Sequence, residues 1–425
     1  MRFFASRTHF HHPLKRISRT HALTASRLAR SLAAAACLAL TACGGGGGGS
    51  TATTPTTPVA VNNTVPMMVD SGPAAASGVI NQPYVSVTIC APGTTTCQTI
   101  DHVLVDTGSY GLRIIAPGLL DPSISLPAVQ TSAGAAVGEC VKFTSGYTWG
   151  SVKLADVKLG GEVASRLPIN IVGDTSATFA TTPSACSSGA SNLGTVAKLG
   201  ANGILGIGVF KEDCGNNCAS SPASGQYYAC TGTTCSSTSL PLVQQVSNPV
   251  AAFPQDNNGV ILVLPSVPAG GLNSVAGSLI FGIGTQANNA FASETVYATN
   301  NVGNFTTTYK GKVLGSSYLD SGSNGYYFPD STIALCSNST GFYCPAGALS
   351  LSAVNTAADG KTSSTVSFNV ENVDSLAAAV SAASVGGTAS SNTFDWGLPF
   401  FFGRRVFVAI ENAGTPKGTG PYWAY

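Results

Sequence analysis

Two short segments, LVDTGS at residues 104–109 and YLDSGS at residues 318–323, decide the fold of this chain of 425 residues. In each segment, apolar residues lead into an Asp that is followed by a hydroxyl residue, a Gly and a Ser. An apolar run that ends in a Gly turn predicts a strand that carries its last side chain, here Asp106 or Asp320, to the tip of a loop. Two such tips suit a hydrolase with paired carboxylates. One Asp would act as a base on water while its protonated partner polarises the substrate carbonyl.

An apolar segment that ends in Gly follows each Asp loop along the chain. The segment NGILGIG, which contains Gly206, follows Asp106, and a Trp-Gly pair that ends at Gly397 follows Asp320. Each half of the chain therefore carries one Asp loop and one apolar-Gly closure. This order indicates an internal duplication and favours an architecture of two lobes.

At these residues the chain resembles the pepsin-like aspartic peptidases, whose two lobes each contribute one Asp-Thr/Ser-Gly loop to a shared site. The segments at residues 278–284 and 406–410 resemble strands of the family's second lobe. The resemblance covers roughly residues 75–425 and implies an all-β, two-lobed pepsin-like fold with the active site between the lobes. Because Pro and Gly cluster between the two halves, we expect an N-terminal lobe over residues 67–268 and a C-terminal lobe over residues 269–425.

The resemblance also implies a role for each residue of the two loops. Asp106 and Asp320 would be the catalytic pair and would share one proton, because two like charges at hydrogen-bonding distance do not both ionise readily. The hydroxyl residues next to them would cross-link the loops, the glycines would let backbone N–H groups approach, and the serines would donate to the outer carboxylate oxygens. These supporting residues are Thr107, Gly108, Ser109, Ser321, Gly322 and Ser323.

Members of this family close the cleft with a hairpin flap whose tip carries a Tyr. The matching segment here is residues 141–150, VKFTSGYTWG. An alignment without gaps on the strand that follows it puts Phe143 at the Tyr position, whereas a small shift puts Tyr147 there. We favour Tyr147 as the flap residue, with packing of these aromatic side chains on a hairpin face as the alternative.

Two residues depart from the family pattern. Arg113 replaces a Trp that usually supports the flap, and we expect it to pair with an acid or to stack on an aromatic ring. Asp395 replaces an apolar residue just before Gly397. We expect Asp395 to lie in an exposed loop, with a position close behind the catalytic pair as the alternative.

Histidine content argues against several other chemistries. Four of the five His lie within residues 1–43, which leaves His102 as the one His of the predicted mature chain. A Ser-His-Asp or Cys-His hydrolase would have to use this residue, and no HExxH spacing or second His supports a metal site. The sequence contains no GxxxxGK[ST] phosphate loop. We therefore expect no metal and no cofactor.

The N-terminal segment has the pattern of an export signal. Residues 1–30 carry seven basic residues and no acid, and a short Ala- and Leu-rich run follows. This run is too short to span a bilayer, which takes about 20 residues. It ends in LTAC at residues 40–43, which resembles the bacterial lipobox, so Cys43 is the predicted lipidation site and residues 1–43 are the predicted signal peptide. The alternative is an ordinary signal peptide that contains a Cys.

Residues 44–66 are rich in Gly, Ser, Thr and Pro and cannot bury a core, so we expect a flexible tether between the lipid anchor and the folded body. No Asp follows Cys43, which by resemblance to enterobacterial lipoproteins favours the outer membrane. The chain after Cys43 carries thirteen basic and nineteen acidic residues, which argues against nucleic-acid binding. We expect a monomer in the bacterial cell envelope, with a peptide or protein as substrate.

Cysteines support an oxidising compartment. The ten Cys outside the signal form close groups that favour local disulfides. We predict the pairs Cys90–Cys97, Cys140–Cys186 and Cys336–Cys344, whereas Cys214, Cys218, Cys230 and Cys235 allow three connectivities. Strands dominate the rest of the pattern, and residues 373–384 form the one helix that we predict.

These observations predict an aspartic-type endopeptidase of the bacterial cell envelope that activates a water between Asp106 and Asp320. One alternative is a peptidase-like lipoprotein that binds peptides or a protein partner without cutting them. A second alternative is a structural surface lipoprotein, which the abundance of Gly, Ser and Thr would allow.

Overall fold

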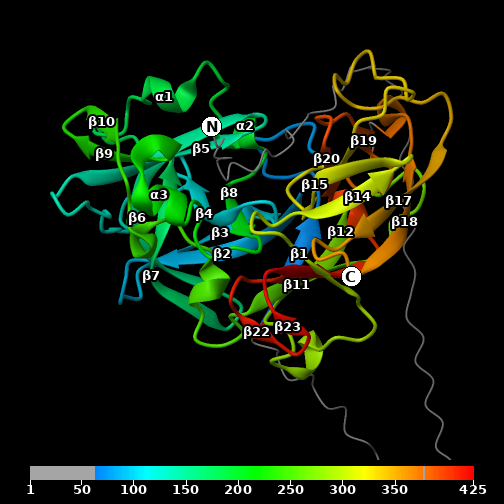
Figure 1. Cartoon of the computed structure of the whole chain (residues 1–425). Coiled ribbons are helices and arrows are strands. Elements are labelled where there is room, and N and C mark those ends of the chain that lie inside the picture. The colour runs from blue at the N-terminus through cyan, green and yellow to red at the C-terminus, as the bar shows by residue number, and fades with distance from the viewer. Residues whose placement is uncertain (1–62, 377–378) are drawn as a thin grey trace, which may run out of the picture.

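The computed structural model describes residues 63–376 and 379–425. The predicted signal peptide, its Cys43, and residues 44–62 of the predicted tether lie outside the described residues. Figure 1 shows two lobes, with the N-terminal half of the chain in cyan and green on one side and the C-terminal half in yellow and orange on the other. Blue, green and red strands lie between and below the two lobes.

The N-terminal lobe is a sheet that curls into a barrel. Its strands are β2 (Pro83–Cys90), β3 (Cys97–Asp106), β4 (Tyr110–Ile115), β5 (Ala136–Phe143), β6 (Gly146–Leu159), β7 (Glu162–Val172), β8 (Gly203–Ile207), β9 (Tyr227–Thr231) and β10 (Thr234–Ser237). They are hydrogen-bonded in the order β10-β9-β5-β6-β7-β4-β8-β3-β2, and β6 also pairs with β2. This last pairing closes six strands into a ring.

A shared layer joins the lobes and uses strands from both ends of the chain. It continues the first sheet in the order β1-β12-β11-β21-β24-β13. These strands are β1 (Thr64–Val69), β11 (Gly259–Leu264), β12 (Val275–Phe281), β13 (Val296–Ala298), β21 (Arg404–Ala409) and β24 (Tyr422–Ala424). The predicted lobe boundary at residues 268–269 falls in the connection between β11 and β12, so it lies inside this layer.

The predicted tether extends too far. β1 begins at Thr64 and pairs antiparallel with β12, so the last three residues of the range 44–66 belong to the folded body. The physical reason is the alternation of Val65, Met67 and Val69, whose side chains are buried while the residues between them face outward. The Pro and Thr residues around this strand make its alternating pattern hard to recognise in the sequence.

The C-terminal lobe is a separate sheet of seven strands in the order β18-β17-β14-β15-β20-β16-β19. Its strands are β14 (Phe305–Tyr309), β15 (Lys312–Asp320), β16 (Tyr326–Tyr327), β17 (Leu349–Thr356), β18 (Ser363–Val370), β19 (Gly386–Gly387) and β20 (Thr393–Gly397), and a small hairpin of β22 (Gly414–Thr415) and β23 (Gly418–Thr419) stands apart. The described helices are α1 (Ser184–Ser187), α2 (Val196–Leu199), α3 (Asn216–Ser220) and the 3-10 turns η1 (Pro222–Ser224), η2 (Leu242–Gln244), η3 (Pro249–Ala252), η4 (Ala287–Asn289), η5 (Val373–Leu376) and η6 (Leu398–Phe400).

The two lobes repeat one arrangement of three strands around each Asp loop. In the first lobe β3 runs parallel to β8, with Asp106 opposite Gly206, and β4 pairs antiparallel with β8. In the second lobe β15 runs parallel to β20, with Asp320 opposite Gly397, and β16 pairs antiparallel with β20. The predicted all-β, two-lobed pepsin-like fold is therefore confirmed, and the duplication extends to the register of the strands.

The closure glycines are required by close packing. A Cβ atom on Gly206 would lie 2.6 Å from the backbone N of Tyr110, and one on Gly397 would lie 2.2 Å from the backbone O of Gly325. A real Cβ does not approach backbone atoms so closely. The return strand after each Asp loop can therefore cross its partner only where that partner has no side chain.

Five disulfides connect the ten described Cys, and the three predicted pairs are confirmed. The group that the sequence left open pairs as Cys214–Cys218 and Cys230–Cys235, of which the second closes the turn between β9 and β10. The predicted helix over residues 373–384 is wrong. In the described part of that range the one helical element is the 3-10 turn η5, whose Val373 and Leu376 are buried in a small apolar cluster.

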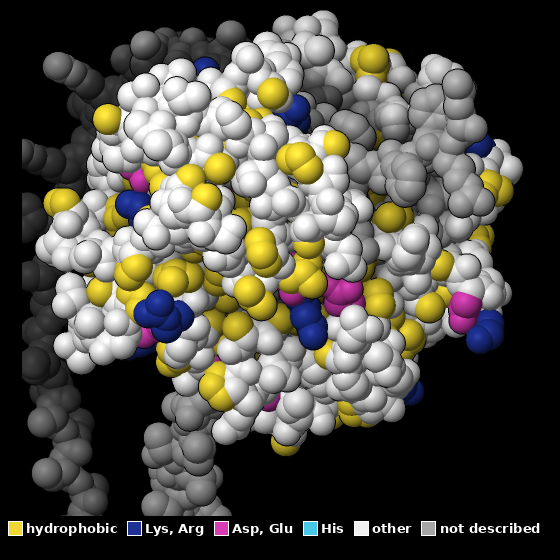
Figure 2. Space-filling view, turned by 60° about the vertical axis from the view of Figure 1, so that its left-hand side comes forward, with side chains coloured by type: hydrophobic (Ala, Val, Ile, Leu, Met, Phe, Trp, Pro, Cys, Tyr) yellow, Lys and Arg dark blue, Asp and Glu magenta, His cyan; other side chains and the backbone are white. Residues whose placement is uncertain are grey.

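The surface carries few charges. Figure 2 shows the face on the side of the N-terminal lobe, where Lys, Arg, Asp and Glu side chains are few and several basic ones lie next to an acidic one. No basic patch is visible on this face, in keeping with the composition. Within residues 63–376 and 379–425, no helix is long and apolar enough to cross a membrane.

Candidate active site

Asp106 is the last residue of β3 and its side chain is held by its own turn. The Gly108 backbone N–H donates to its Oδ1 at 2.9 Å, and the Ser109 hydroxyl donates to its Oδ2 at 2.5 Å. Only 2% of Asp106 is exposed. Hydrogen bonds of this kind stabilise a carboxylate that has been removed from water.

Asp320 at the end of β15 has the same environment. The Gly322 backbone N–H donates to its Oδ1 at 2.9 Å, and the Ser323 hydroxyl donates to its Oδ2 at 2.8 Å. Asp320 is fully buried. The two predicted Asp residues therefore accept hydrogen bonds from matching donors, one set in each half of the internal duplication.

The inner oxygens of the two carboxylates converge on one point. A Cβ atom built on Gly322 would lie 2.7 Å from Oδ1 of Asp106 and 3.2 Å from Oδ1 of Asp320. Because both Oδ1 atoms lie within 3.2 Å of this one position, the structure brings the two predicted carboxylates together in one site. Any side chain at Gly322 would collide with both of them, which explains why this position is Gly.

Reciprocal hydrogen bonds cross-link the two loops. The Ser321 backbone N–H donates to Oγ1 of Thr107 at 2.9 Å, and the Thr107 backbone N–H donates to Oγ of Ser321 at 3.1 Å. Each hydroxyl then donates to a carbonyl of the opposite strand, Thr107 to Leu319 at 2.9 Å and Ser321 to Val105 at 2.7 Å. All of these groups are buried, so the loops of the two lobes are fixed to each other.

A third carboxylate lies on the same face of the sheet as Asp320. Across the sheet Tyr318 stands opposite Asp395, Asp320 stands opposite Gly397, and Tyr327 stands opposite Asp395 from the other side. Opposed residues share a face of a sheet, and so do residues two apart along a strand. Tyr318, Asp395 and Tyr327 therefore form a row directly behind Asp320.

The expectation that Asp395 lies in an exposed loop is wrong. Asp395 is fully buried in β20, because the Trp-Gly closure forms a strand there and not a loop. Burial raises the pKa of the Tyr318 phenol well above its ordinary value, and the nearby carboxylates of Asp395, Asp320 and Asp106 raise it further. Burial and the carboxylates of Asp395 and Asp320 do the same to Tyr327. Both phenols are therefore protonated and can donate hydrogen bonds.

Arg113, on β4 behind the first loop, is confirmed as an acid-paired side chain. Its Nη2 lies 2.8 Å from Oε1 of Glu139 and 2.8 Å from Oδ2 of Asp213, and its Nη1 donates to the Tyr110 carbonyl at 2.7 Å. The side chains of Arg113, Glu139 and Asp213 are at most 3% exposed. The Tyr227 hydroxyl donates to Oδ1 of Asp213 at 2.5 Å and completes the group.

This buried group has one cation for two acids. Burial raises the pKa of Asp213 well above its ordinary value, the charge of Glu139 raises it further, and Arg113 offsets these effects only in part. Burial alone would lower the pKa of Arg113, but the two carboxylates hold it above its ordinary value. Asp213 therefore keeps a proton at pH values where an exposed Asp would be ionised.

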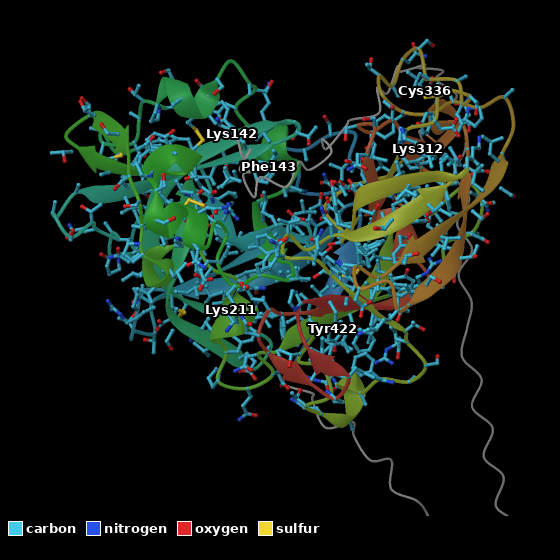
Figure 3. All side chains as sticks on the ribbon, in the orientation of Figure 1. Lys142, Phe143, Lys211, Lys312, Cys336 and Tyr422 are labelled. Atoms are coloured by element: carbon cyan, nitrogen blue, oxygen red, sulfur yellow. A yellow bond between two sulfur atoms is a disulfide. The ribbon has the colours of Figure 1, made fainter. Side chains whose placement is uncertain are left out.

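The hairpin of β5 and β6 stands where the flap was expected. Its turn lies between Phe143 and Gly146, and Figure 3 shows Lys142 and Phe143 at this end of the hairpin, toward the middle of the molecule. Tyr147 does not project from this tip. Its side chain is buried in a cluster around the Cys140–Cys186 disulfide, together with Trp149, because the strand turns that face inward. Phe143 is half-buried next to the turn and packs against an apolar cluster that contains Leu104 and Ile204.

His102 contacts residues outside the two Asp loops. His102 Nε2 lies 3.4 Å from Asp70, and its ring packs edge-on against Tyr84. Among the described residues, one group of metal-ligand types gathers at Cys336, Cys344 and Asp374, but both of its sulfur atoms are joined in a disulfide.

The sequence does not predict the partners of Arg113 or the two Tyr residues of the row, and it gives a position behind the catalytic pair only as the alternative for Asp395. Glu139, Asp213 and Tyr227 come from separate segments, and nothing in their spacing announces that they meet. The sequence does contain a signal for Tyr318 and Asp395. Tyr318 lies two residues before Asp320, Asp395 lies two residues before Gly397, and Asp320 and Gly397 stand opposite each other.

Three comparisons with known proteins gave the following results. A family model described as "Protein of unknown function (DUF3443)" matches residues 59–425. No curated protein matches the chain. The crystal structure of an aspartic proteinase from Irpex lacteus is similar, with a TM-score of 0.46 and 18% identity, over 85% of this chain and 96% of that chain.

Proposed function

We propose that this chain, which belongs to the DUF3443 family, is an aspartic-type endopeptidase that hydrolyses peptide bonds with a water activated between Asp106 and Asp320. The observation that carries the proposal is the convergence of two buried carboxylates, one from each lobe, on loops that are cross-linked through Thr107 and Ser321. A structural turn would need neither the matched donors nor the cross-link.

The proposed reaction follows from a carboxyl pair that holds one proton. The ionised Asp removes a proton from the water, and the resulting hydroxide attacks the carbonyl carbon of the scissile bond. The protonated Asp donates to the carbonyl oxygen, so negative charge does not build up on it. The pair then donates a proton to the amide nitrogen, the C–N bond breaks, and the carboxylic acid and amine leave. The shared proton is restored at the end of the cycle.

We propose that the enzyme acts in the bacterial cell envelope, held by a lipid on Cys43 at the outer membrane. Five disulfides support an oxidising compartment, because such bonds persist outside the cytoplasm. The substrate is a peptide or protein, and the enzyme works as a monomer without metal or cofactor. Phe143 at the hairpin tip would cover the bound substrate.

A second candidate, a protein that binds peptides without cutting them, is favoured by one observation. Asp320 is fully buried and Asp106 is 2% exposed, so a substrate and water must gain access to carboxylates that are closed off in this conformation. A binding protein would not need that access.

The test is a digest of a peptide library by the purified protein, with its disulfides formed, from about pH 3 to 7, the range in which a carboxyl pair titrates. Asp106→Asn and Asp320→Asn are the active-site variants. Asp359→Asn is the matched control, because Asp359 lies in an exposed turn of the C-terminal lobe. A statine-type transition-state mimic serves as inhibitor.

We expect cleavage by the wild type and by the Asp359 variant, and a loss of at least about a thousandfold in kcat for either active-site variant, the order of losses when a catalytic group is removed. Binding of the peptides without cleavage at any pH would support the second candidate. Cleavage that survives both active-site substitutions would overturn the proposed mechanism.

A further inference from the structure

The row of side chains behind Asp320 has no place in the reaction described above. It consists of Tyr318, Asp395 and Tyr327, on the adjacent strands β15, β20 and β16. Asp395 and Tyr327 are fully buried, and Tyr318 is 8% exposed. The opposite face of the same strands carries Leu319, Trp396 and Tyr326 in the apolar core. A carboxylate at such a fully buried position costs free energy unless it is paired or hydrogen-bonded.

The duplication provides a comparison within the molecule. In the first lobe the positions that match Tyr318 and Asp395 are Leu104 and Ile204, which stand opposite each other between β3 and β8. Both are buried in an apolar cluster. The fold is thus built with two apolar residues at these positions in one lobe and with a phenol and a carboxylate in the other. Packing alone does not require the polar pair.

Among the described residues, the charged groups that act most strongly on the two phenols of this row are acids. Those that act on the Tyr318 phenol are Asp395, Asp320 and Asp106, and those that act on the Tyr327 phenol are Asp395 and Asp320. Arg404 acts on Tyr326, which lies on the opposite face. Tyr327 also donates to Oδ1 of Asn324 at 2.6 Å. Three carboxyl groups and two phenols therefore lie close together in a buried part of the site.

We propose that Asp395 is a positioning residue that, with the Tyr318 phenol, holds the shared proton of the Asp106–Asp320 pair to higher pH than two carboxylates alone would. This inference deepens the proposed function and rests on it for its consequence, which is peptide cleavage at a higher pH. The physical cause is the repulsion between a third buried negative charge and the doubly ionised pair. Tyr318 stands opposite Asp395 across the sheet, and its protonated phenol would stabilise the ionised form of Asp395.

The experiment measures the proton directly. Infrared difference spectra of the whole protein, recorded as a function of pH, follow the carbonyl band of protonated carboxyl groups. Asp106→Asn and Asp320→Asn identify the band of the pair. We expect Asp395→Asn to lower the pH at which this band disappears by about one unit, a tenfold loss of proton affinity. Tyr318→Phe should shift it in the same direction, and Asp359→Asn should leave it unchanged.

Two further readouts separate this inference from the proposed function. Thermal unfolding shows whether each variant is folded, and Tyr318→Phe tests the same coupling if Asp395→Asn does not fold. The pH profile of kcat/KM shows whether its alkaline limb moves with the infrared band. A shift of the band in an inactive protein would keep the inference and remove the proposed function. A band that titrates at the same pH in the wild type and in the folded variants would overturn the inference, whether or not the protein cleaves peptides.

Discussion

The backbone N–H groups of Thr107 and Ser321, 214 residues apart, each donate to the side-chain hydroxyl of the other residue. The bonds measure 3.1 and 2.9 Å and lie in a buried environment. Each hydroxyl also donates to the opposite strand, so four hydrogen bonds join the two lobes at the base of the catalytic loops. This cross-link ties the position of one carboxylate to that of the other.

Removal of one hydroxyl tests the cross-link. Ser321→Ala removes the hydrogen bonds that the Ser321 hydroxyl makes with the Thr107 N–H and the Val105 carbonyl, and an unsatisfied buried group costs about 1–3 kcal/mol. We expect the free energy of unfolding to fall by that amount and kcat to fall more than tenfold, because the carboxylates lose their alignment. Urea unfolding and peptide cleavage measure the two effects. Ser321→Thr keeps the hydroxyl and is the control, and equal kcat for the Ala and Thr variants would contradict the alignment role.

Arg113 neutralises a buried charge behind the first loop. Arg113→Met keeps an unbranched apolar stem but leaves Glu139 and Asp213 without their cation. Breaking a buried ion pair from one side typically costs about 3–5 kcal/mol, and we expect a loss of this size in urea unfolding. The triple variant with Glu139→Gln and Asp213→Asn removes the acids as well and should recover most of the loss. A triple variant as unstable as the single one would show that Arg113 acts through packing.

The raised pKa of Asp213 predicts how stability depends on pH. The folded protein binds this proton more tightly than the unfolded chain, whose Asp titrates near the ordinary value of about 3.9. The contribution to stability is therefore complete below that value and is lost as the pH rises through the higher folded-state pKa. Asp213→Asn removes the titration while keeping an acceptor for the Tyr227 hydroxyl.

Urea unfolding of the wild type and of Asp213→Asn, compared from about pH 4 to 8, checks this prediction. We expect the stability of the wild type to fall relative to that of the variant as the pH rises. Parallel curves would mean that Asp213 releases its proton at the same pH in both states.

The parts of the fold that the sequence predicts are those set by local chemistry. An apolar run into Asp-hydroxyl-Gly-Ser specifies a strand and a tight turn, and both copies form as expected at Asp106 and Asp320. Close pairs such as Cys90 and Cys97 are likewise joined by the hairpin between them. In these cases the residues that determine the structure are neighbours along the chain.

The features that the sequence did not predict depend on residues that are distant along the chain. Arg113 meets Glu139 and Asp213 only because β4, β5 and the segment after β8 come together in the N-terminal lobe. The sequence predicts an exposed loop for Asp395, whereas the pairing of β20 with strands on both sides buries it. Tertiary pairing here overrides the local preference.

The β5–β6 hairpin offers two aromatic residues that could cover the substrate. Phe143 stands at the tip of the β5–β6 hairpin and is half-buried, whereas Tyr147 is packed around the Cys140–Cys186 disulfide. Phe143→Ala removes the ring that would cover the substrate, so we expect kcat/KM to fall about tenfold or more, in line with the loss of a positioning contact. Tyr147→Phe removes only a hydroxyl from a buried ring and should leave kcat/KM within about twofold, since no substrate contact is lost. Peptide cleavage by the two variants decides between the residues, because a larger loss for Tyr147→Phe would return the flap role to Tyr147.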